Sequence, residues 1–302
     1  MKILVSGLLN IETTVAVRGF PINYYPIDYP FFGIDSNVSG VGFNIAKAMT
    51  ALGDEVNLIS CLGNDAEADR ILGQMKKDNI STSDISRGLR STPVSVVLFD
   101  PQGKRQIYCD LKGIQEQLLS PDRYTDDLKG CDIAALCNIN FNRDLIKAAR
   151  PSGVTTATDV HVLGDADDAY NRDFMENADI LFLSDENLPC SAEDFIARLY
   201  ERYHNRIIAV GMGSKGAMLF DSAKNELCTV PAYSGVRIVN TIGAGDALFS
   251  AFLHFYAKGM DPKSAMQRAV VFAGVKIGSN GASVGFCGEN EVEQRLASEY
   301  GK

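Results

Sequence analysis

Residues 240–257 read NTIGAGDALFSAFLHFYA, a glycine-containing turn that runs directly into an apolar helical stretch. Two glycines around one small residue allow the backbone to come close to a ligand. The helix that follows directs its free N–H groups and the positive end of its dipole back at that turn, which favours an anion. Asp246 falls in the first helical turn, where a general base for an attacking hydroxyl would stand. The same carboxylate could simply stabilise the helix start, and the pattern alone leaves both readings open.

A second glycine segment, SGVGFN at residues 39–44, also opens a predicted helix. Gly40 and Gly42 would permit close approach of a ligand, and the amide of Asn44 offers donors and an acceptor to a polyhydroxylated molecule. A tight turn before a helix explains the same residues equally simply. The helix itself is predicted to end at Gly53, a typical C-terminal cap.

A third segment, GMGSKG at residues 211–216, matches the GxGxxG dinucleotide-binding pattern. That fingerprint requires a helix directly afterwards. Here AMLF, a DSAKNE turn and LCTV follow, which predict two strands joined in a hairpin. The context therefore argues against a Rossmann-type oxidoreductase, although a loop over nucleotide phosphates remains allowed.

Strand-like and helical segments alternate along the chain, which predicts an α/β fold with a largely parallel sheet. The strand-like runs are KILVSG, EVNLISCLG, DIAALCN, ADILFLS and RIIAVG. Two stretches break the alternation: residues 13–36, rich in Pro and Tyr, and a hairpin around residues 100–104. Together they predict a small lid set against the sheet.

The first of these stretches carries a run of aromatic residues: Tyr24, Tyr25, Tyr29, Phe31 and Phe32. These rings could stack on a nucleobase, pack on a sugar face, or form the lid's own small core. The sequence does not decide among the three.

Composition excludes several other classes of protein. The 302 residues are 46% apolar with a net charge of −9, which argues against a nucleic-acid surface. The start reads as a buried strand rather than a signal peptide, and no stretch is long enough to span a membrane, so we expect a cytoplasmic protein. Seven scattered cysteines without a CxxC pair predict free thiols, and three isolated histidines offer little material for a Cys/His metal cluster.

The three glycine segments, in this order, resemble the ribokinase-like (PfkB-type) carbohydrate kinase family. NTIGAGDALFSAF is similar to its C-terminal signature and SGVGFNIAKAMTALG to its N-terminal glycine pair, and GLLNIE, AVGMGSKGAMLF and FAGVKIGSNGAS also match. The resemblance implies one domain over residues 1–302, a three-layer α/β/α sandwich with a mostly parallel sheet, and a β-sheet lid from about 12–36 and 91–110. It implies ATP- and Mg²⁺-dependent phosphorylation of a hydroxyl on a small sugar. A nucleoside kinase of the same fold and a catalytically weak nucleotide or sugar sensor are the alternatives.

The resemblance also assigns roles to individual residues. Asp246 would be the catalytic base, and the anion hole would be formed by Gly243, Ala244 and Gly245. The acceptor would be bound by Asn10, Glu12, Gly40, Gly42 and Asn44. The nucleotide would lie near Gly211, Gly213, Ser214, Gly216, Thr241 and Asn280. Lids in this family often pair between subunits, which makes a homodimer plausible.

Four positions depart from the family's pattern. Asn240 replaces an Asp that ribokinases associate with a monovalent cation site, so the need for such a cation is open. SDEN at 184–187 replaces the NxxE segment that organises Mg²⁺, and either Asp185 or Glu186 could substitute. Ser39 replaces the first glycine of its pair, and Glu12 replaces an Asp. Specificity therefore cannot be copied from ribose.

Overall fold

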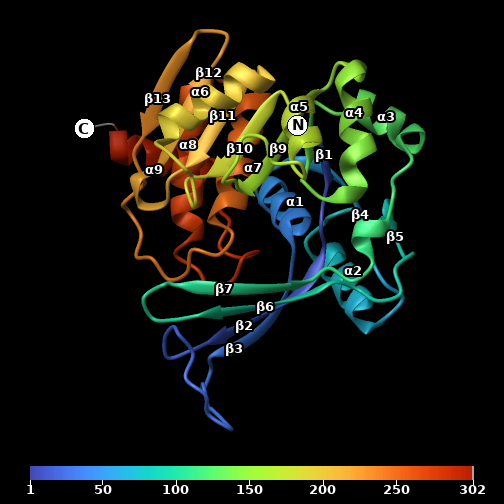
Figure 1. The fold of residues 1–302 in the computed structure, drawn as a ribbon, viewed down its shortest axis with the longest axis vertical. Coiled ribbons are helices and arrows are strands. Elements are labelled where there is room, and N and C mark those ends of the chain that lie inside the picture. The colour runs from blue at the N-terminus through green and yellow to red at the C-terminus, as the bar shows by residue number, and fades with distance from the viewer. Residues whose placement is uncertain (301–302) are drawn as a thin grey trace.

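The computed structural model describes residues 1–300 as a large sheet with helices on both faces and a separate small sheet (Figure 1). The large sheet is nine-stranded in the order β13-β12-β11-β10-β9-β8-β1-β4-β5. Its strands are β1 (Lys2–Ser6), β4 (Glu55–Cys61), β5 (Ile85–Ser86), β8 (Ile133–Leu136), β9 (Thr155–Val162), β10 (Ile180–Ser184), β11 (Ile207–Gly211), β12 (Ala217–Asp221) and β13 (Glu226–Val230). Pairing is parallel except for β11–β12 and β12–β13, which confirms the predicted fold class and the hairpin after GMGSKG.

The direction of the chain through this sheet reverses at β1. From β1 the chain proceeds to β4 and β5 on one side, and it later adds β8 to β11 on the other. In open parallel sheets of this kind, ligands bind beyond the carboxyl ends of the strands, next to such a reversal. The β1–β8 boundary therefore marks where a site is expected.

Nine helices cover the sheet in the described residues: α1 (Val41–Leu52), α2 (Ala66–Lys77), α3 (Thr125–Gly130), α4 (Arg143–Ser152), α5 (Arg172–Asn177), α6 (Ala192–Tyr203), α7 (Ala244–Ala257), α8 (Pro262–Lys276) and α9 (Glu289–Tyr300). Helix α7 packs on both α1 and α8, whereas α4 packs on both α3 and α5. Gly53 ends α1 in the left-handed conformation with φ +97°, as predicted. Most of α7 is buried, so its apolar run is a core helix, and no described helix is long and apolar enough to cross a membrane.

The small sheet has the strand order β3-β2-β6-β7 and lies as a separate layer beneath the large sheet in Figure 1. Its strands are β2 (Asn10–Ala16), β3 (Ile34–Ser39), β6 (Val94–Phe99) and β7 (Arg105–Asp110). The hairpin predicted around residues 100–104 joins β6 to β7 and is confirmed. Val97 of β6 packs in a small buried cluster with Ile242 and Ala282, which lie in the loops around α7 and α8. The small sheet is therefore attached next to the NTIGAGD turn.

The aromatic run between β2 and β3 is not a core of its own. Exposed fractions run from 50% for Tyr25 to 104% for Phe32, and the only ring pair among these residues is Tyr29 with Phe31. Of the three roles that the sequence leaves open for these rings, the small core of the lid is wrong, because the segment that carries them has no regular structure to pack them against.

The cysteines are all free thiols, as predicted from their number and spacing. Three of them are buried, namely Cys61, Cys137 and Cys287, while Cys109 is exposed on β7. Cys137 directly follows β8 and its thiol lies against Gly7. The three buried cysteines belong to the hydrophobic core around the large sheet.

Candidate active site

Asp246 lies in the first turn of α7, buried to 8% exposure. Its Oδ2 accepts a hydrogen bond of 2.7 Å from Nδ2 of Asn44 on α1. Oδ1 of Asn44 in turn accepts from the Ser39 hydroxyl at 3.4 Å. The two glycine segments thus meet in space although they lie far apart in the chain. The hydrogen bond fixes the orientation of a carboxylate that could accept a proton.

The turn before Asp246 has the geometry of an anion cradle. Gly243 caps α7 in the left-handed conformation at φ +76°, and a Cβ there would lie 2.6 Å from the Ala282 carbonyl oxygen. The Ala244 N–H is used inside the turn, where it donates to Thr241 O at 3.2 Å. A helix leaves further N–H groups of its first turn without intrahelical acceptors, which here are those of Gly245 and Asp246. Gly245 is exposed, so this end of the helix is open to a ligand.

The acceptor-side residues of β2 are close to the same point. Asn10 is buried and donates from Nδ2 to the Ser95 hydroxyl at 2.9 Å, while its Oδ1 has no hydrogen-bond partner among the described residues. A buried amide oxygen normally has a donor, so a hydroxyl-bearing ligand would satisfy it. Glu12 lies two residues further on and is half-buried. Asp246 is close enough for its negative charge to raise the pKa of Glu12.

The glycine pair has a structural reason of its own. Gly40 adopts φ +103°, and a Cβ there would lie 2.4 Å from the Leu8 carbonyl oxygen. A Cβ on Gly42 would lie 2.7 Å from the Gly7 carbonyl carbon. Both glycines are buried, so close packing of α1 on the β1–β2 connection requires them. Their direct contact with an acceptor stays a prediction.

The residues assigned to the nucleotide side cluster after β10 and β11. Gly213 and Ser214 form a short exposed helical turn after β11, and Gly211 O accepts from the Asp185 N–H at 2.9 Å. Gly216 adopts φ +94°, and its missing side chain is required by contact with Val230 O. These loops lie at the carboxyl ends of neighbouring strands, where a nucleotide would reach the α7 turn.

Asn280 and Thr241 flank that turn. The Asn280 side chain accepts from Asn240 Nδ2 at 3.0 Å and donates to Asp35 of β3 at 3.4 Å. Thr241 is exposed directly before the cradle. The loop after α8, the turn before α7 and the small sheet are thereby connected by one chain of hydrogen bonds.

The charges at the site act on one another. Burial raises the pKa of Asp246, and the neighbouring Asp159 carboxylate adds to this, whereas His161 and the Asn44 hydrogen bond oppose it. Burial, together with the charge of Asp246, also raises the pKa of Glu12. A carboxylate with a raised pKa is a better proton acceptor once ionised, which suits a general base.

Three residues of the site were missed in the sequence. Asp159 and His161 lie at the carboxyl end of β9, with His161 Nδ1 at 3.5 Å from Asp159 Oδ2. Burial disfavours the charged imidazole, but the Asp159 carboxylate outweighs it and raises the pKa of His161 to about 9. The sequence offered little signal for them, because TTATDVHV is not a continuous apolar run that would predict β9. The histidines were weighed in the sequence only as parts of a Cys/His metal cluster, so the effect of the His161 charge on Asp246 was not anticipated.

Lys276 is the third missed residue. It ends α8, is fully buried, and its ammonium donates to the carbonyl oxygens of Ile242 and, at 2.9 Å, of Gly281. Burial lowers the pKa of Lys276 to about 8, although the charges of Asp246 and Glu12 favour its protonated form.

The segment 184–187 offers limited ligands for a metal. No group of three His, Cys, Asp or Glu side chains that could hold an ion occurs in the part of the chain that the structure describes. Mg²⁺ that is shared with nucleotide phosphates needs only one or two carboxylates. Asp185 follows β10 beside Gly211, and Glu186 forms a 3.6 Å ion pair with Arg105 of β7. The carboxylates therefore fit such an ion, and which of the two would bind it stays open.

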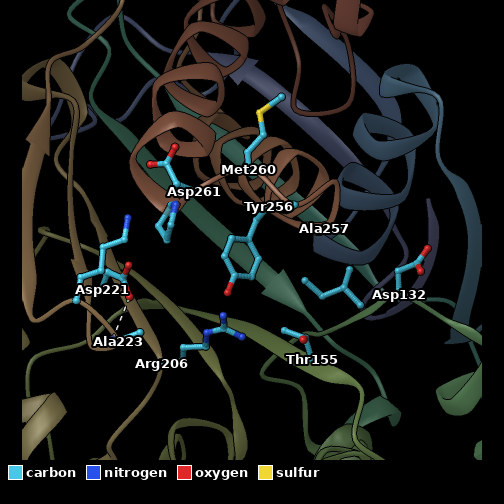
Figure 2. A pocket seen from close by; sticks show the side chains of 13 residues that line it. Asp132, Thr155, Arg206, Asp221, Ala223, Tyr256, Ala257, Met260 and Asp261 are labelled. Carbon is cyan, nitrogen blue, oxygen red and sulfur yellow. Dashed lines mark hydrogen bonds between the residues drawn. The ribbon is translucent and has the colours of Figure 1, made fainter.

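A cavity of about 490 Å³, whose lining side chains are drawn in Figure 2, lies away from Asp246. Its lining includes Ile133 and Thr155, at the amino ends of β8 and β9, and Arg206, directly before β11. The Arg206 guanidinium lies 5.6 Å from the centre of the Tyr256 ring. This cavity is at the opposite strand ends from Asp246 and is not part of the site.

Known proteins show the same arrangement of elements. The model of the pfkB family of carbohydrate kinases matches residues 2–286. A deoxyribokinase of Salmonella typhi is 27% identical over 98% of this chain and 99% of its own length. A microbiome-derived acarbose kinase superposes with a TM-score of 0.88 at 24% identity, covering 98% of each chain. The Arabidopsis thaliana ribokinase solved with ribose and ATP gives 0.80 at 20% identity, covering 97% and 98%.

These matches run over nearly the whole chain and include the turn that holds Asp246. A family in which each named relative is a kinase implies transfer of a phosphoryl group to an alcohol acceptor. The chain therefore belongs to the pfkB family of carbohydrate kinases and has its three-layer α/β/α fold.

Proposed function

We propose that this protein transfers the γ-phosphoryl group of ATP to a hydroxyl of a small sugar, with Asp246 as the base. The observation that carries the proposal is the burial of Asp246 at the amino end of α7, oriented by Asn44. The carboxylate would take the proton of the acceptor hydroxyl while that oxygen bonds to the γ-phosphorus and the bond to ADP breaks. N–H groups of the α7 turn would stabilise the phosphoryl oxygens during transfer.

The nucleotide would lie along the loops that follow β10 and β11, with Gly211, Gly213, Ser214 and Gly216 on one side. Thr241 and Asn280 would close the other side. Mg²⁺, when bound with ATP, would neutralise charge between the β- and γ-phosphates, and Asp185 or Glu186 would hold it. Arg105 of the small sheet already reaches Glu186, so lid and nucleotide loops act together.

A sugar fits the acceptor side better than a nucleoside. The residues there are polar: Asn10, Glu12, Ser39, Asn44 and Ser95. The unpartnered Oδ1 of Asn10 would accept a bond from a sugar hydroxyl. A nucleobase would need a stacking surface, but the aromatic run before β3 is exposed to solvent in this chain. Nucleosides stay the second candidate class, because a lid can move on binding.

The small sheet would serve as a lid that excludes water from the reaction, and its exposed rings favour a homodimer formed through the lid. Ile34 of β3 and Ile107 of β7 add to that exposed apolar surface. Size-exclusion chromatography coupled to light scattering would give the mass of a dimer if the lid pairs two subunits and the mass of a monomer if it does not. We place the protein in the cytoplasm, where ATP and Mg²⁺ are available.

The test is ADP release with Mg²⁺ and ATP over a panel of aldoses, ketoses, sugar phosphates and nucleosides. A signal on one sugar class would support the proposal and identify the substrate class. A signal on nucleosides alone would overturn the sugar assignment but leave the chemistry. ATP binding without ADP release on any acceptor of the panel would favour the sensor alternative. Asn240 and segment 184–187 would then be the cause of the missing activity.

A further inference from the structure

A buried ammonium group lies directly beneath the catalytic turn. Lys276 is the last residue of α8 and is fully buried, which is rare for a lysine. Its Nζ donates to Ile242 O, in the turn before α7, and to Gly281 O, in the loop after α8. The ammonium therefore joins the two loops that border the anion cradle.

The ligands of this ammonium are of the kind that a monovalent cation takes. Backbone carbonyl oxygens replace the hydration shell of potassium in protein sites. An ammonium group carries the same single charge and can donate three hydrogen bonds to such oxygens. The two acceptors of the Lys276 ammonium among the described residues are both backbone carbonyl oxygens, one from each loop beside it.

The position that the family resemblance associates with such a cation is occupied by a neutral side chain in this chain. Asn240 stands two residues before Ile242, and its neutral amide bonds to Asn280 and to the Ile242 N–H. A buried cation needs opposite charge or several oxygen ligands nearby. With Asn240 neutral, a second cation beside Lys276 would meet repulsion from the ammonium without a carboxylate of residue 240 to offset it. The residues present do not fit a bound monovalent cation.

We propose that the Lys276 ammonium takes the place of a bound monovalent cation beneath residues 240–243, so that phosphoryl transfer by this chain requires no potassium. The inference rests on the kinase function proposed above. Lys276 is a positioning residue: it holds the Ile242 carbonyl and places a fixed positive charge behind the cradle. The carboxylates of Asp246 and Glu12 and the guanidinium of Arg105 act on this charge, so the ammonium in turn acts on the base.

Two variants distinguish the effect of the Lys276 charge from the effect of the volume that its side chain fills. Lys276→Met fills the position without a charge, whereas Lys276→Ala opens it to solvent ions. Kinetics and thermal unfolding are measured in potassium chloride and in choline chloride, since choline is too large to enter. Lys263→Ala, an exposed lysine on the same helix, is the control for loss of a positive charge.

Wild-type protein and Lys263→Ala should show the same turnover and Tm in both salts. Lys276→Met should lose about 100-fold in kcat with a small change in acceptor KM, and potassium should not restore it. Lys276→Ala should regain turnover in potassium, and its Tm should rise by about 3 °C over that in choline.

A rise in wild-type turnover or Tm with potassium would show a separate cation site and overturn the proposal. Turnover of Lys276→Met at the wild-type rate in choline would overturn it as well. So would a Lys276→Ala protein whose turnover and Tm are the same in potassium and in choline. If no acceptor is phosphorylated at all, the kinase proposal fails, and the Tm comparison still decides whether Lys276 replaces the cation.

Discussion

Asn44 of α1 donates a 2.7 Å hydrogen bond to Asp246 of α7, a residue 202 positions further along the chain. The bond joins the N-terminal and C-terminal glycine segments at the carboxyl ends of the parallel strands. It also favours the ionised form of Asp246 against the effect of burial. The orientation of the proposed base thus depends on one amide, which also adds to the effect of the His161 charge on the pKa of Asp246.

Asp246→Asn should lower kcat by about 10³-fold and leave the affinity for ATP nearly unchanged, because a base acts only in the transfer step. Steady-state kinetics and calorimetric titration with ATP measure the two quantities. Asp144→Asn, an exposed carboxylate on α4, should change neither. Turnover of the Asp246 variant at the wild-type rate would refute the assignment of the base.

Asn44→Ala should reduce kcat by about 10-fold and shift the acidic limb of its pH profile upward, since the lost hydrogen bond no longer favours the carboxylate. The pH dependence of kcat measures this shift. Asn57→Ala removes a comparable side-chain bond, to Asp127, away from the site. This control should not change the pH profile of kcat. If the acidic limb of the Asn44→Ala profile also stayed at its wild-type position, the proposed coupling between Asn44 and Asp246 would be contradicted.

Glu12→Ala should raise the KM of the acceptor by about 10-fold with little effect on the KM of ATP, because β2 borders the acceptor side. Initial rates with each substrate varied in turn separate the two constants. The exposed Glu55 on β4 provides the matched control. An effect on the KM of ATP alone would mean that the acceptor site is misplaced.

Gly243→Ala and Gly245→Ala should behave differently. A methyl group on Gly243 would combine a φ of +76° with a 2.6 Å contact to Ala282 O, so we expect a loss of about 2 kcal/mol in the free energy of unfolding. On Gly245 the nearest neighbour would be Asp159 Oδ2 at 4.0 Å, and stability should hold while turnover falls. Denaturant unfolding and kinetics distinguish them, and equal stabilities would contradict the argument.

Turnover should follow a bell-shaped pH profile. The acidic limb reflects Asp246, whose pKa burial raises, and the alkaline limb reflects Lys276, whose pKa of about 8 means that its charge is lost above that pH. The free energy of unfolding should change with pH in the opposite direction to the turnover on the alkaline side. Between about pH 8 and 10.5 the unfolded chain binds a proton on Lys276 that the folded chain has released, so this group's contribution to stability rises with pH.

Measuring kcat and the free energy of unfolding on the same samples separates the two effects. Asp246, Glu12 and Arg105 are the charged groups that act on Lys276. In Lys276→Met the alkaline limb near pH 8 should disappear from the residual activity. A limb that persists there would have to come from another group.

The sequence was sufficient for the elements whose pattern is local. Continuous apolar runs predicted β1, β4, β8, β10 and β11, and the glycine of the αL cap predicted the end of α1. It was not sufficient for β9, because TTATDVHV places buried Thr156 and Thr158 where an apolar run would be expected. It also missed β3, whose residues are mostly exposed and polar. Both strands depend on their partners in the sheets rather than on their own composition.

The site was predictable only in part for the same reason. Asp246 and its turn form a local motif, whereas the contact with Asn44 depends on packing of α1 against α7. Lys276 looks like an ordinary basic residue in the last turn of a helix, where it favours the dipole. Its burial against two loop carbonyls depends on how those loops fold over the helix end. The adjacency of Asp159 and His161 to the base required the position of β9.

The position of β1 inside the sheet, between β8 and β4, has a consequence for synthesis of the chain. This first strand pairs with β4 and with β8, so one of its edges stays open until β8 has left the ribosome. Helix α7, which carries Asp246, is made after all the strands of the sheet and packs on α1, which precedes most of them. A nascent chain can therefore form part of the sheet before it has the proposed site, which can assemble only after α7 has been made.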